Sequence, residues 1–325
     1  MKKISFIIFI LFFSSLIAET VSATTIISPL LEMSVDPGGN QKGILKVYNE
    51  TDNQLTLTAS IEPFKSADEN GQPRYLAPSE KDVFLTWFNI GNEVLILKPK
   101  EVALVPFFVA PPLNAVPGGY YAVIFWRSGG VQDASVSVGS KVGTLIFLQI
   151  NGSLEESGEI ADFNLAAKSN FIFSLPLNFI VRFYNSGNIH LAPTGTIELR
   201  NWFGKETILN VNQDQKLILP GSIRRFDEVW HNLPASTNIW QSFWQAAKAE
   251  FDEQAFGPYS ATLHLTYGAA EDKEIIQRFS FWIFPWHLIL ICVVLIIILV
   301  GFWKINKKAN RLKKRKINQA DAKKV

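Results

Sequence analysis

Short apolar segments alternating with polar positions cover most of the chain from residue 26 to residue 283, separated by turns rich in Pro, Gly, Asn and Asp. A period of two is typical of strands that bury one face, and turns at this spacing favour an antiparallel sandwich. The pattern predicts a first set of strands at 26–35, 43–49, 54–63, 84–90, 94–97, 102–109, 119–127 and 141–150. It predicts a second set at 160–167, 177–184, 194–199, 206–211, 216–219, 223–230, 259–267 and 274–283.

These two sets predict an all-β fold class: two tandem immunoglobulin-like β-sandwiches followed by one transmembrane α-helix. We expect the first sandwich at 24–150, a linker at 151–158 and the second sandwich at 159–284. Four matches occur in the same order in both sets: Tyr48-Asn49 with Tyr184-Asn185, Ile61-Glu62 with Ile197-Glu198, Leu95–Leu97 with Leu217–Leu219, and Gly118–Tyr120 with Gly257–Tyr259. Ordered matches of this kind indicate two copies of one structural plan.

One segment of the second sandwich, 237–256, has helical rather than strand periodicity. Its aromatic residues, Trp240 and Trp244 among them, recur at intervals of three and four, and Thr237 stands where a helix N-cap is expected. We interpret it as a short helix lying across the sandwich. The alternative is a helix on the membrane surface or against a partner, although membrane-surface helices usually carry more basic residues than the single Lys248.

A continuous apolar segment at 285–303 contains no Asp, Glu, Lys or Arg. About 18 to 20 such residues in a helix cross a hydrocarbon core of roughly 30 Å. Trp286 and Trp303 stand at its two ends, and Lys304 begins a basic tail at 304–325. We therefore predict a transmembrane helix that contacts the lipid bilayer, with these three residues at the membrane interfaces and the tail in the cytoplasm.

The first 23 residues have the pattern of a secretory signal peptide. Lys2 and Lys3 precede an apolar run, and Val21-Ser22-Ala23 fits a cleavage site. Combined with the apolar segment near the C-terminus, this predicts a single-pass protein of the cell membrane whose two sandwiches are extracellular.

The formal net charge of +2 conceals two unlike regions. The tail has ten basic residues and one acidic residue, whereas residues 24–303 contain 19 basic and 27 acidic residues. A mildly acidic body argues against a nucleic-acid partner. The lone cysteine, Cys292, excludes an intrachain disulfide, and the four histidines lack metal-ligand spacing. We predict no catalytic residues, no cofactor and no metal site, and hence no enzyme.

The motifs Asn49-Glu-Thr51 and Asn151-Gly-Ser153 match the sequon for N-glycosylation. Motifs this short also occur by chance. They do not establish a modified surface.

Strands at 102–109, 119–127 and 145–150 are predicted to be apolar on both faces, whereas an antiparallel sheet exposed to water normally has one polar face. Either the polar loop at 65–82 or the second sandwich covers the additional apolar face, or this face binds a partner or a second copy of the chain. The sequence leaves both explanations open. The possible partner surface comprises Tyr121, Val123, Phe125, Trp240 and Trp244.

The order of segments, together with the motifs Asp36-Pro-Gly38, Tyr48-Asn49, Leu97-Lys-Pro99 and Pro117-Gly-Gly-Tyr120, resembles two-domain surface proteins of Gram-positive bacteria that interact with WxL proteins. The resemblance implies that the first domain binds peptidoglycan and that the second binds other proteins. The Trp-rich segment 237–256 departs from the family pattern.

We therefore expect a membrane-anchored binding or adhesion protein that holds a cell-wall polymer (peptidoglycan) or another surface protein. An alternative is an assembly subunit or chaperone-like module whose apolar strands accept a strand from a secreted partner. An enzyme is the third and least favoured hypothesis.

Overall fold

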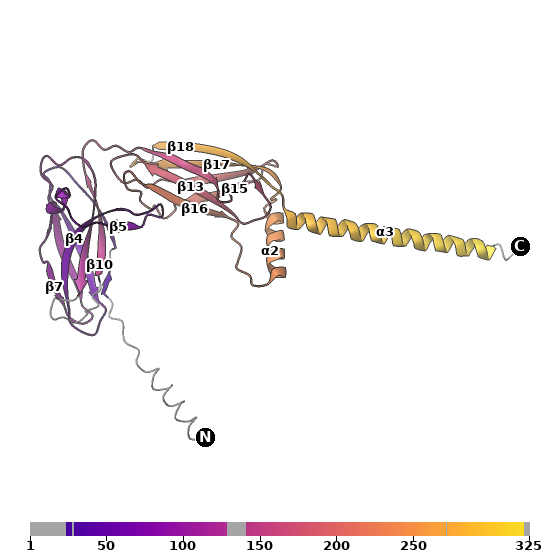
Figure 1. Ribbon diagram of the computed structural model, residues 1–325, viewed down its shortest axis with the longest axis horizontal. Coiled ribbons are helices and arrows are strands. Elements are labelled where there is room, and N and C mark those ends of the chain that lie inside the picture. The colour runs from indigo at the N-terminus through magenta and orange to yellow at the C-terminus, as the bar shows by residue number, and fades with distance from the viewer. Residues whose placement is uncertain (1–23, 28, 129–140, 271, 322–325) are drawn as a thin grey trace, which may run out of the picture. The chain divides into compact units, whose positions relative to one another are not determined.

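The computed structural model describes residues 24–27, 29–128, 141–270 and 272–321 (Figure 1). The signal peptide predicted at 1–23 lies outside the described residues. The chain divides into two compact units: one up to Ala67 with Gln72–Glu155 and Gly187–Ile189, the other Asp68–Gly71 with Glu156–Ser186 and the residues from His190 onward.

The first unit is built from strands and a short 3-10 helix. Its described elements are β1 (Thr24–Ile26), β2 (Leu30–Val35), β3 (Gln41–Asn49), β4 (Leu55–Ser66), β5 (Pro73–Tyr75), η1 (Val83–Trp87), β6 (Phe88–Ile90), β7 (Val94–Leu97), β8 (Val102–Val109), β9 (Gly118–Ser128) and β10 (Lys141–Ile150). One sheet has the strand order β1-β3-β8-β6. The other has the order β2-β10-β9-β4-β5, with β7 also paired to β4.

One hydrophobic core joins the two sheets of this unit. Val105 and Phe107 from the first sheet and Ile124 and Trp126 from the second are at most 3% exposed. In β8, alternate residues from Val105 to Val109 are buried and the residues between them are exposed. This alternation follows from the pleat of a strand, which sends successive side chains to opposite faces.

The second unit is a sandwich with two helices. Its described elements are β11 (Gly158–Leu165), β12 (Phe171–Ile172), β13 (Leu177–Asn185), β14 (Thr194–Asn201), β15 (Glu206–Val211), β16 (Ile223–Trp230), α2 (Ile239–Asp252), β17 (Gly257–Tyr267), β18 (Lys273–Ile283) and α3 (Trp286–Asp321). The sheets have the orders β11-β13-β16 and β12-β18-β17-β14-β15. Phe179, Val181 and Phe183 of the smaller sheet and Leu263 and Phe281 of the larger are fully buried.

Both units follow one strand plan, as the four sequence matches predict. The order β2-β10-β9-β4 recurs as β12-β18-β17-β14, and β1-β3-β8 recurs as β11-β13-β16. β2 pairs in parallel with β10, and β12 pairs in parallel with β18. Gly118 and Gly257 begin the equivalent strands β9 and β17 with φ angles of 145° and 86°, which glycine adopts far more readily than other residues.

The predicted fold class is confirmed. Each unit is built mainly of strands arranged in two sheets, and the helices of the described chain are η1, α2 and α3. The prediction of a strand at 84–90 is wrong in its first half, where the chain forms the 3-10 helix η1. This helix places Phe84 and Trp87, which are three residues apart, against the ring of Tyr120. The strand predicted at 216–219 is also wrong, because only one bridge, Leu191 to Ile218, forms there.

The helix predicted within 237–256 is present as α2, although its cap differs from the prediction. The Asn238 side chain accepts a hydrogen bond of 2.9 Å from the Trp240 backbone N–H, so Asn238 is the N-cap and the assignment of Thr237 is wrong.

α3 contains the one apolar segment in the described chain that is long enough to cross a membrane, Trp286–Lys308, with a mean hydropathy of 3.0. The helix does not end at Trp303 but continues to Asp321. The basic tail sustains it because Lys and Arg are good helix formers and no Gly or Pro follows Gly301.

Candidate functional site

The surface predicted on β9 is covered. Val123 and Phe125 are buried and Tyr121 is half-buried. Tyr75 of β5 packs edge-on against Phe125 with ring centroids 4.9 Å apart, and Phe64 of β4 lies 6.0 Å from Tyr121. The end of β4 and the short strand β5 thus shield this face. The prediction that Val123 and Phe125 form a free partner surface is wrong.

β8 is also apolar on both faces, and its face turned away from the core is exposed. The outer face of β3 and β8 carries five exposed apolar residues, Ile44, Val102, Leu104, Pro106 and Phe108, together with Lys42, Lys46 and the half-buried Tyr48. Leu104 is 61% exposed. The register places Pro106 opposite Ile44, so these side chains lie on adjoining strands and form one patch.

Two lysines of β3 lie within this outer face, on either side of Ile44. Lys42 lies opposite Phe108 and Lys46 lies opposite Leu104, and both lysines are exposed. An exposed apolar patch with a few charged groups has the composition of a protein-interaction surface. The positive charge on this face would complement an acidic partner.

Part of one edge of β8 is open. β3 pairs with β8 as far as Val102, whereas β6 pairs only with residues 107–109. The Asn49 N–H donates to the Glu101 carbonyl at 3.0 Å, and hydrogen-bonded positions alternate along an antiparallel pair. Leu104 therefore directs its backbone N–H and C=O away from β3. No described strand pairs with that edge between residues 102 and 105.

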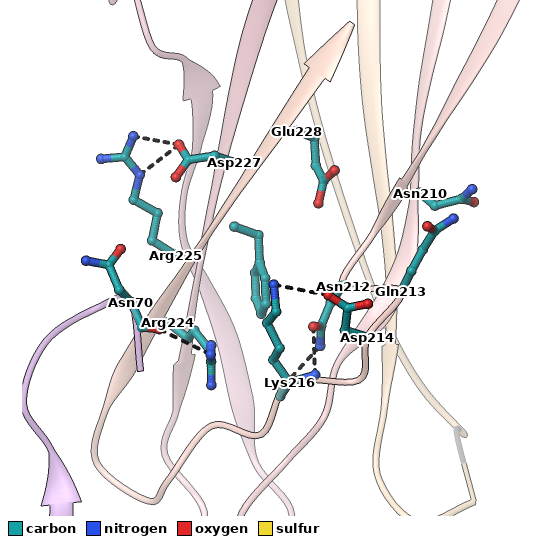
Figure 2. Close-up of a pocket in the computed structure, with 11 residues that line it drawn as sticks. Asn70, Asn210, Asn212, Gln213, Asp214, Lys216, Arg224, Arg225, Asp227 and Glu228 are labelled. Atoms are coloured by element: carbon teal, nitrogen blue, oxygen red, sulfur yellow. Dashed lines mark hydrogen bonds and ion pairs between the residues drawn. The ribbon is translucent and has the colours of Figure 1, made fainter. Parts of the chain in front are cut away.

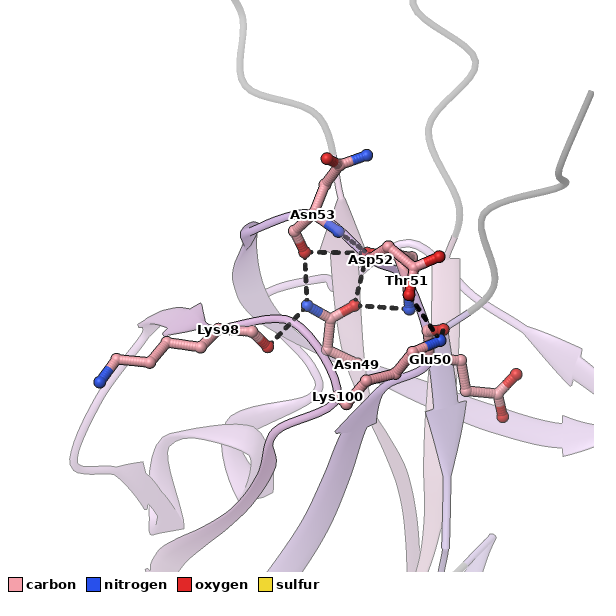
Figure 3. Close-up of polar contacts among 7 residues, drawn as sticks. All are labelled: Asn49, Glu50, Thr51, Asp52, Asn53, Lys98 and Lys100. Atoms are coloured by element: carbon pink, nitrogen blue, oxygen red, sulfur yellow. Dashed lines mark hydrogen bonds and ion pairs between the residues drawn. The ribbon is translucent and has the colours of Figure 1, made fainter.

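Asn49, the first residue of a glycosylation sequon, has a structural role (Figure 3). Its side chain is fully buried and donates to the carbonyls of Asn53 at 2.8 Å and Lys98 at 2.9 Å. Its side-chain oxygen accepts from the Thr51 N–H at 3.0 Å and from the Thr51 hydroxyl at 2.8 Å. In this fold the amide nitrogen is enclosed and unavailable to a glycan.

A polar pocket of about 480 Å³ lies in the second unit, beside the turn after β15 (Figure 2). Its charges largely neutralise one another, since Arg225 contacts Asp227 at 2.6 Å and Lys216 contacts Asp214 at 3.3 Å. Burial raises the pKa of the Glu228 carboxyl that lines the pocket. These internal ion pairs leave little uncompensated charge for recognising an ionic ligand.

The remaining predicted site residues lie on the two helices. Trp240 and Trp244 project from α2 with 74% and 58% exposure. Trp286 begins α3, while Trp303 and Lys304 are exposed seventeen and eighteen residues further along the same helix. These residues are predictable from the sequence, whereas the outer face of β3 and β8 is not, because apolar composition does not show which strand face is covered.

In comparisons with known proteins, the chain is similar only to solved structures. No protein-family model matches the chain, and no curated protein matches its sequence. The class 5 fimbriae chaperone CfaA matches at 12% identity and a TM-score of 0.40, over 79% of this chain and 98% of that chain. The CupB2 chaperone of Pseudomonas aeruginosa matches at 11% identity and a TM-score of 0.33, over 79% and 100%.

The E. coli chaperone DraB matches at 11% identity and a TM-score of 0.35, over 80% of this chain and 97% of that chain. Identities and TM-scores this low carry no functional assignment for this chain.

Proposed function

We propose that this chain is a membrane-anchored, non-enzymatic protein that binds another protein through the outer face of β3 and β8. The observation that carries the proposal is the exposure of five adjoining apolar residues on a folded sheet. Monomeric soluble proteins rarely expose a large contiguous apolar patch unless it binds something. Removing these side chains from water would supply the main driving force for binding.

A protein partner suits this face better than a wall polymer does. Glycan chains carry hydroxyl and amide groups that lose hydrogen bonds to water when they are pressed against an apolar surface. Lys42, Lys46 and Tyr48 are the residues of this face with side-chain donors, and the five apolar residues beside them offer nothing to replace those bonds. The resemblance to surface proteins that interact with WxL proteins supports a partner of the same class, a surface protein.

The proposed anchor is α3. Trp286 and Trp303 fit the two headgroup regions, and the Lys307 ammonium lies 4.7 Å from the Trp303 ring centroid, where it can reach the aqueous side. The basic residues that follow favour a cytoplasmic tail, which leaves both sandwiches on the outer side of the cell membrane.

Matched variants test the role of the outer face. Leu104→Glu places a charge within it, whereas Ile96→Glu changes a side chain of similar exposure, 59% against 61%, on β7 of the other sheet. We expect Leu104→Glu to weaken partner binding at least tenfold, or about 1.4 kcal/mol, and Ile96→Glu to leave it unchanged. Co-purification from native membranes measures binding by the two full-length variants, and a photo-reactive residue at position 104 or 96 of the otherwise unsubstituted protein reports contact.

Digestion of the crosslinked product separates the two partner classes. A discrete adduct from position 104 that protease removes and wall hydrolase does not supports a protein partner. Equal crosslinking from positions 96 and 104, or an adduct that only wall hydrolase removes, would contradict the proposal.

The open edge of β8 favours a second candidate function, in which a partner strand adds to this sheet, as in an assembly or chaperone-like module. About four residues, 102–105, are accessible to such a strand, which at about 3.3 Å per residue is roughly 13 Å of edge. Pro106 lacks an N–H and limits the addition on one side.

Proline substitution distinguishes this candidate from binding to the face. Leu104→Pro removes an N–H that points away from β3 and keeps the face apolar. We expect it to abolish binding by strand addition while preserving most binding to the face. Val102→Pro provides a second test at the same edge, and a folded variant of either kind that binds fully would exclude strand addition.

A further inference from the structure

Three exposed aromatic residues form one stripe along α2. Trp240, Trp244 and Phe251 are 74%, 58% and 72% exposed. At 100° per residue, their positions fall within about 40° of one another on the helix circumference. The buried residues of α2, Ala246, Ala247, Ala249 and Glu250, centre roughly 120° from the stripe on the same circumference. The stripe therefore borders the buried side of α2 and is itself exposed.

α2 is fixed to the first turn of α3. The buried Glu250 carboxylate contacts Nδ1 of His287 at 2.6 Å and accepts from the Leu288 N–H at 3.3 Å. The Phe243 ring lies 5.8 Å from the Trp286 ring and 5.0 Å from the His287 ring. α2 runs across the start of α3 rather than along it (Figure 1). A membrane crossed by α3 would thus have α2 at its surface.

The C-terminal end of α2 is also fixed to the sandwich. The Lys205 ammonium donates to the Asp252 carbonyl at 2.7 Å and to the Glu253 carboxylate at 3.0 Å. His231 also contacts Glu253, at 3.1 Å. Because α2 is held at Phe243, Glu250 and its C-terminal end, the aromatic stripe keeps a defined orientation relative to the beginning of α3.

Further exposed aromatic residues lie at the same end of the second unit. Phe284 lies two residues before α3 and stacks on Phe171, Phe173 and Trp282, at ring separations of 6.1 to 6.2 Å. Trp202 lies beside Gly257, where β17 begins opposite the last residue of β18. We refer to the exposed aromatic residues at this end as the aromatic collar: Phe171, Phe173, Trp202, Phe203, Trp240, Trp244, Phe251, Phe256 and Trp282.

We propose that the aromatic collar is a lipid-binding surface that holds the second unit in the headgroup region of the outer leaflet, with α2 lying in the membrane plane. Tryptophan and other amphipathic rings prefer this depth. The collar lies beside the start of α3, because Trp282 stacks on Phe284, two residues before that helix, and α2 contacts its first turn. The inference rests on the proposed insertion of α3 in a membrane.

The charge of α2 indicates which lipids matter. Lys248 is its one basic residue, and it contacts Asp252 at 3.1 Å. A helix that must find the membrane by itself usually needs many basic residues. α2 does not need them, because α3 already attaches it to the bilayer. The collar should therefore bind zwitterionic lipid as well as anionic lipid.

Spin-label accessibility in the full-length protein tests the depth of the collar. Cys292 is the only cysteine, so Cys292→Ser permits labelling at single introduced cysteines. Labels at Trp244→Cys and Phe251→Cys report on the collar. Ile276→Cys, on β18 and 56% exposed, is the matched control, and Leu295→Cys within α3 reports on membrane insertion. The protein is reconstituted in phosphatidylcholine vesicles with and without phosphatidylglycerol.

We expect labels at positions 244, 251 and 295 to be more accessible to dissolved oxygen than to a water-soluble nickel chelate, and the label at 276 to show the reverse. At each position, the ratio of oxygen accessibility to nickel-chelate accessibility should agree within about twofold between the two lipid mixtures. If position 295 lies in lipid while 244 and 251 lie in water, the collar proposal is overturned and the anchor stands.

Labels at 244 and 251 shielded from both reagents would indicate a protein contact and would likewise overturn the proposal. A water-exposed label at 295 would overturn the proposed anchor and the collar together.

Discussion

Asn49 joins two turns of the first unit through one buried side chain, and its removal should be costly. Asn49→Ala leaves the carbonyls of Asn53 and Lys98 without that donor and the Thr51 N–H without that acceptor. A buried hydrogen-bonding group left unpaired costs about 1–3 kcal/mol, so we expect a loss of about 2–4 kcal/mol in the free energy of unfolding. Urea denaturation would measure it.

The exposed Asn53 provides the control, because only its backbone takes part in this network. Asn53→Ala should change stability by less than about 0.5 kcal/mol. Equal effects of the two substitutions would contradict the structural role of Asn49.

Glu253 gives the attachment of α2 a dependence on pH. Burial opposes its ionised form, but hydrogen bonds from Lys205 and His231 outweigh this effect and lower the pKa of the carboxyl below its ordinary value of 4.5. A lowered pKa in the folded state stabilises the protein above pH 4.5, and this contribution is lost as the pH falls through the folded-state value.

We therefore expect Glu253→Gln to lower the melting temperature at pH 7 by about 2–4 °C, with the difference from the unsubstituted protein shrinking below pH 4.5. Melting temperatures of both proteins, measured in detergent across the pH range, test this expected difference. Asp252→Asn, which alters only an exposed ion pair with Lys248, should have little effect at any pH. A difference that grows toward low pH would refute the sign of the effect.

At the scale of elements, the Glu250–His287 contact couples α2 to α3. Glu250→Ala leaves the His287 ring and the Leu288 N–H without this buried partner. A loss of about 2 kcal/mol would raise local opening of α2 roughly 30-fold. Hydrogen exchange should therefore accelerate across Ile239–Asp252 and not in the buried strand β17.

Asp252→Ala, at an exposed position on α2, is the control for this exchange experiment and should leave α2 protected. Uniform acceleration throughout the second unit would instead show that Glu250 stabilises the whole sandwich.

Strand positions were predictable wherever period-two alternation was long. β17 alternates from Tyr259 to Tyr267 as predicted, with these two residues and the alternate residues between them buried. β5 and β12, three and two residues long, are too short to show a period. Pairing with a neighbouring strand defines them, and that pairing depends on residues far away in sequence.

The partner surface was harder to predict for the same reason. β8 and β9 are both apolar on two faces, and composition alone does not say which surplus face is covered. The outer face of β9 is covered because β5 pairs with the end of β4 and places the Tyr75 ring against Phe125. The outer face of β8 has no such cover among the described residues, and its exposure becomes visible only in three dimensions.

At the scale of the whole molecule, the separation of charge along the chain predicts its orientation in the membrane. Residues 24–303 carry more acidic than basic residues, whereas the tail holds ten basic residues beside the apolar segment. Basic residues flanking a membrane span are retained in the cytoplasm. The first unit should therefore be accessible from outside the cell and the tail should not.

Single cysteines in the Cys292→Ser background test this orientation. Val94→Cys lies on an exposed part of β7, and Asn310→Cys lies at an exposed position of α3 beyond the apolar segment. We expect a membrane-impermeant maleimide to label position 94 in intact cells and position 310 only after permeabilisation. Leu295→Cys should stay unlabelled in both cases, because a thiol in the hydrocarbon core meets no aqueous reagent. Labelling of position 310 in intact cells would reverse the proposed topology, and it would place any binding by the outer face of β3 and β8 inside the cell.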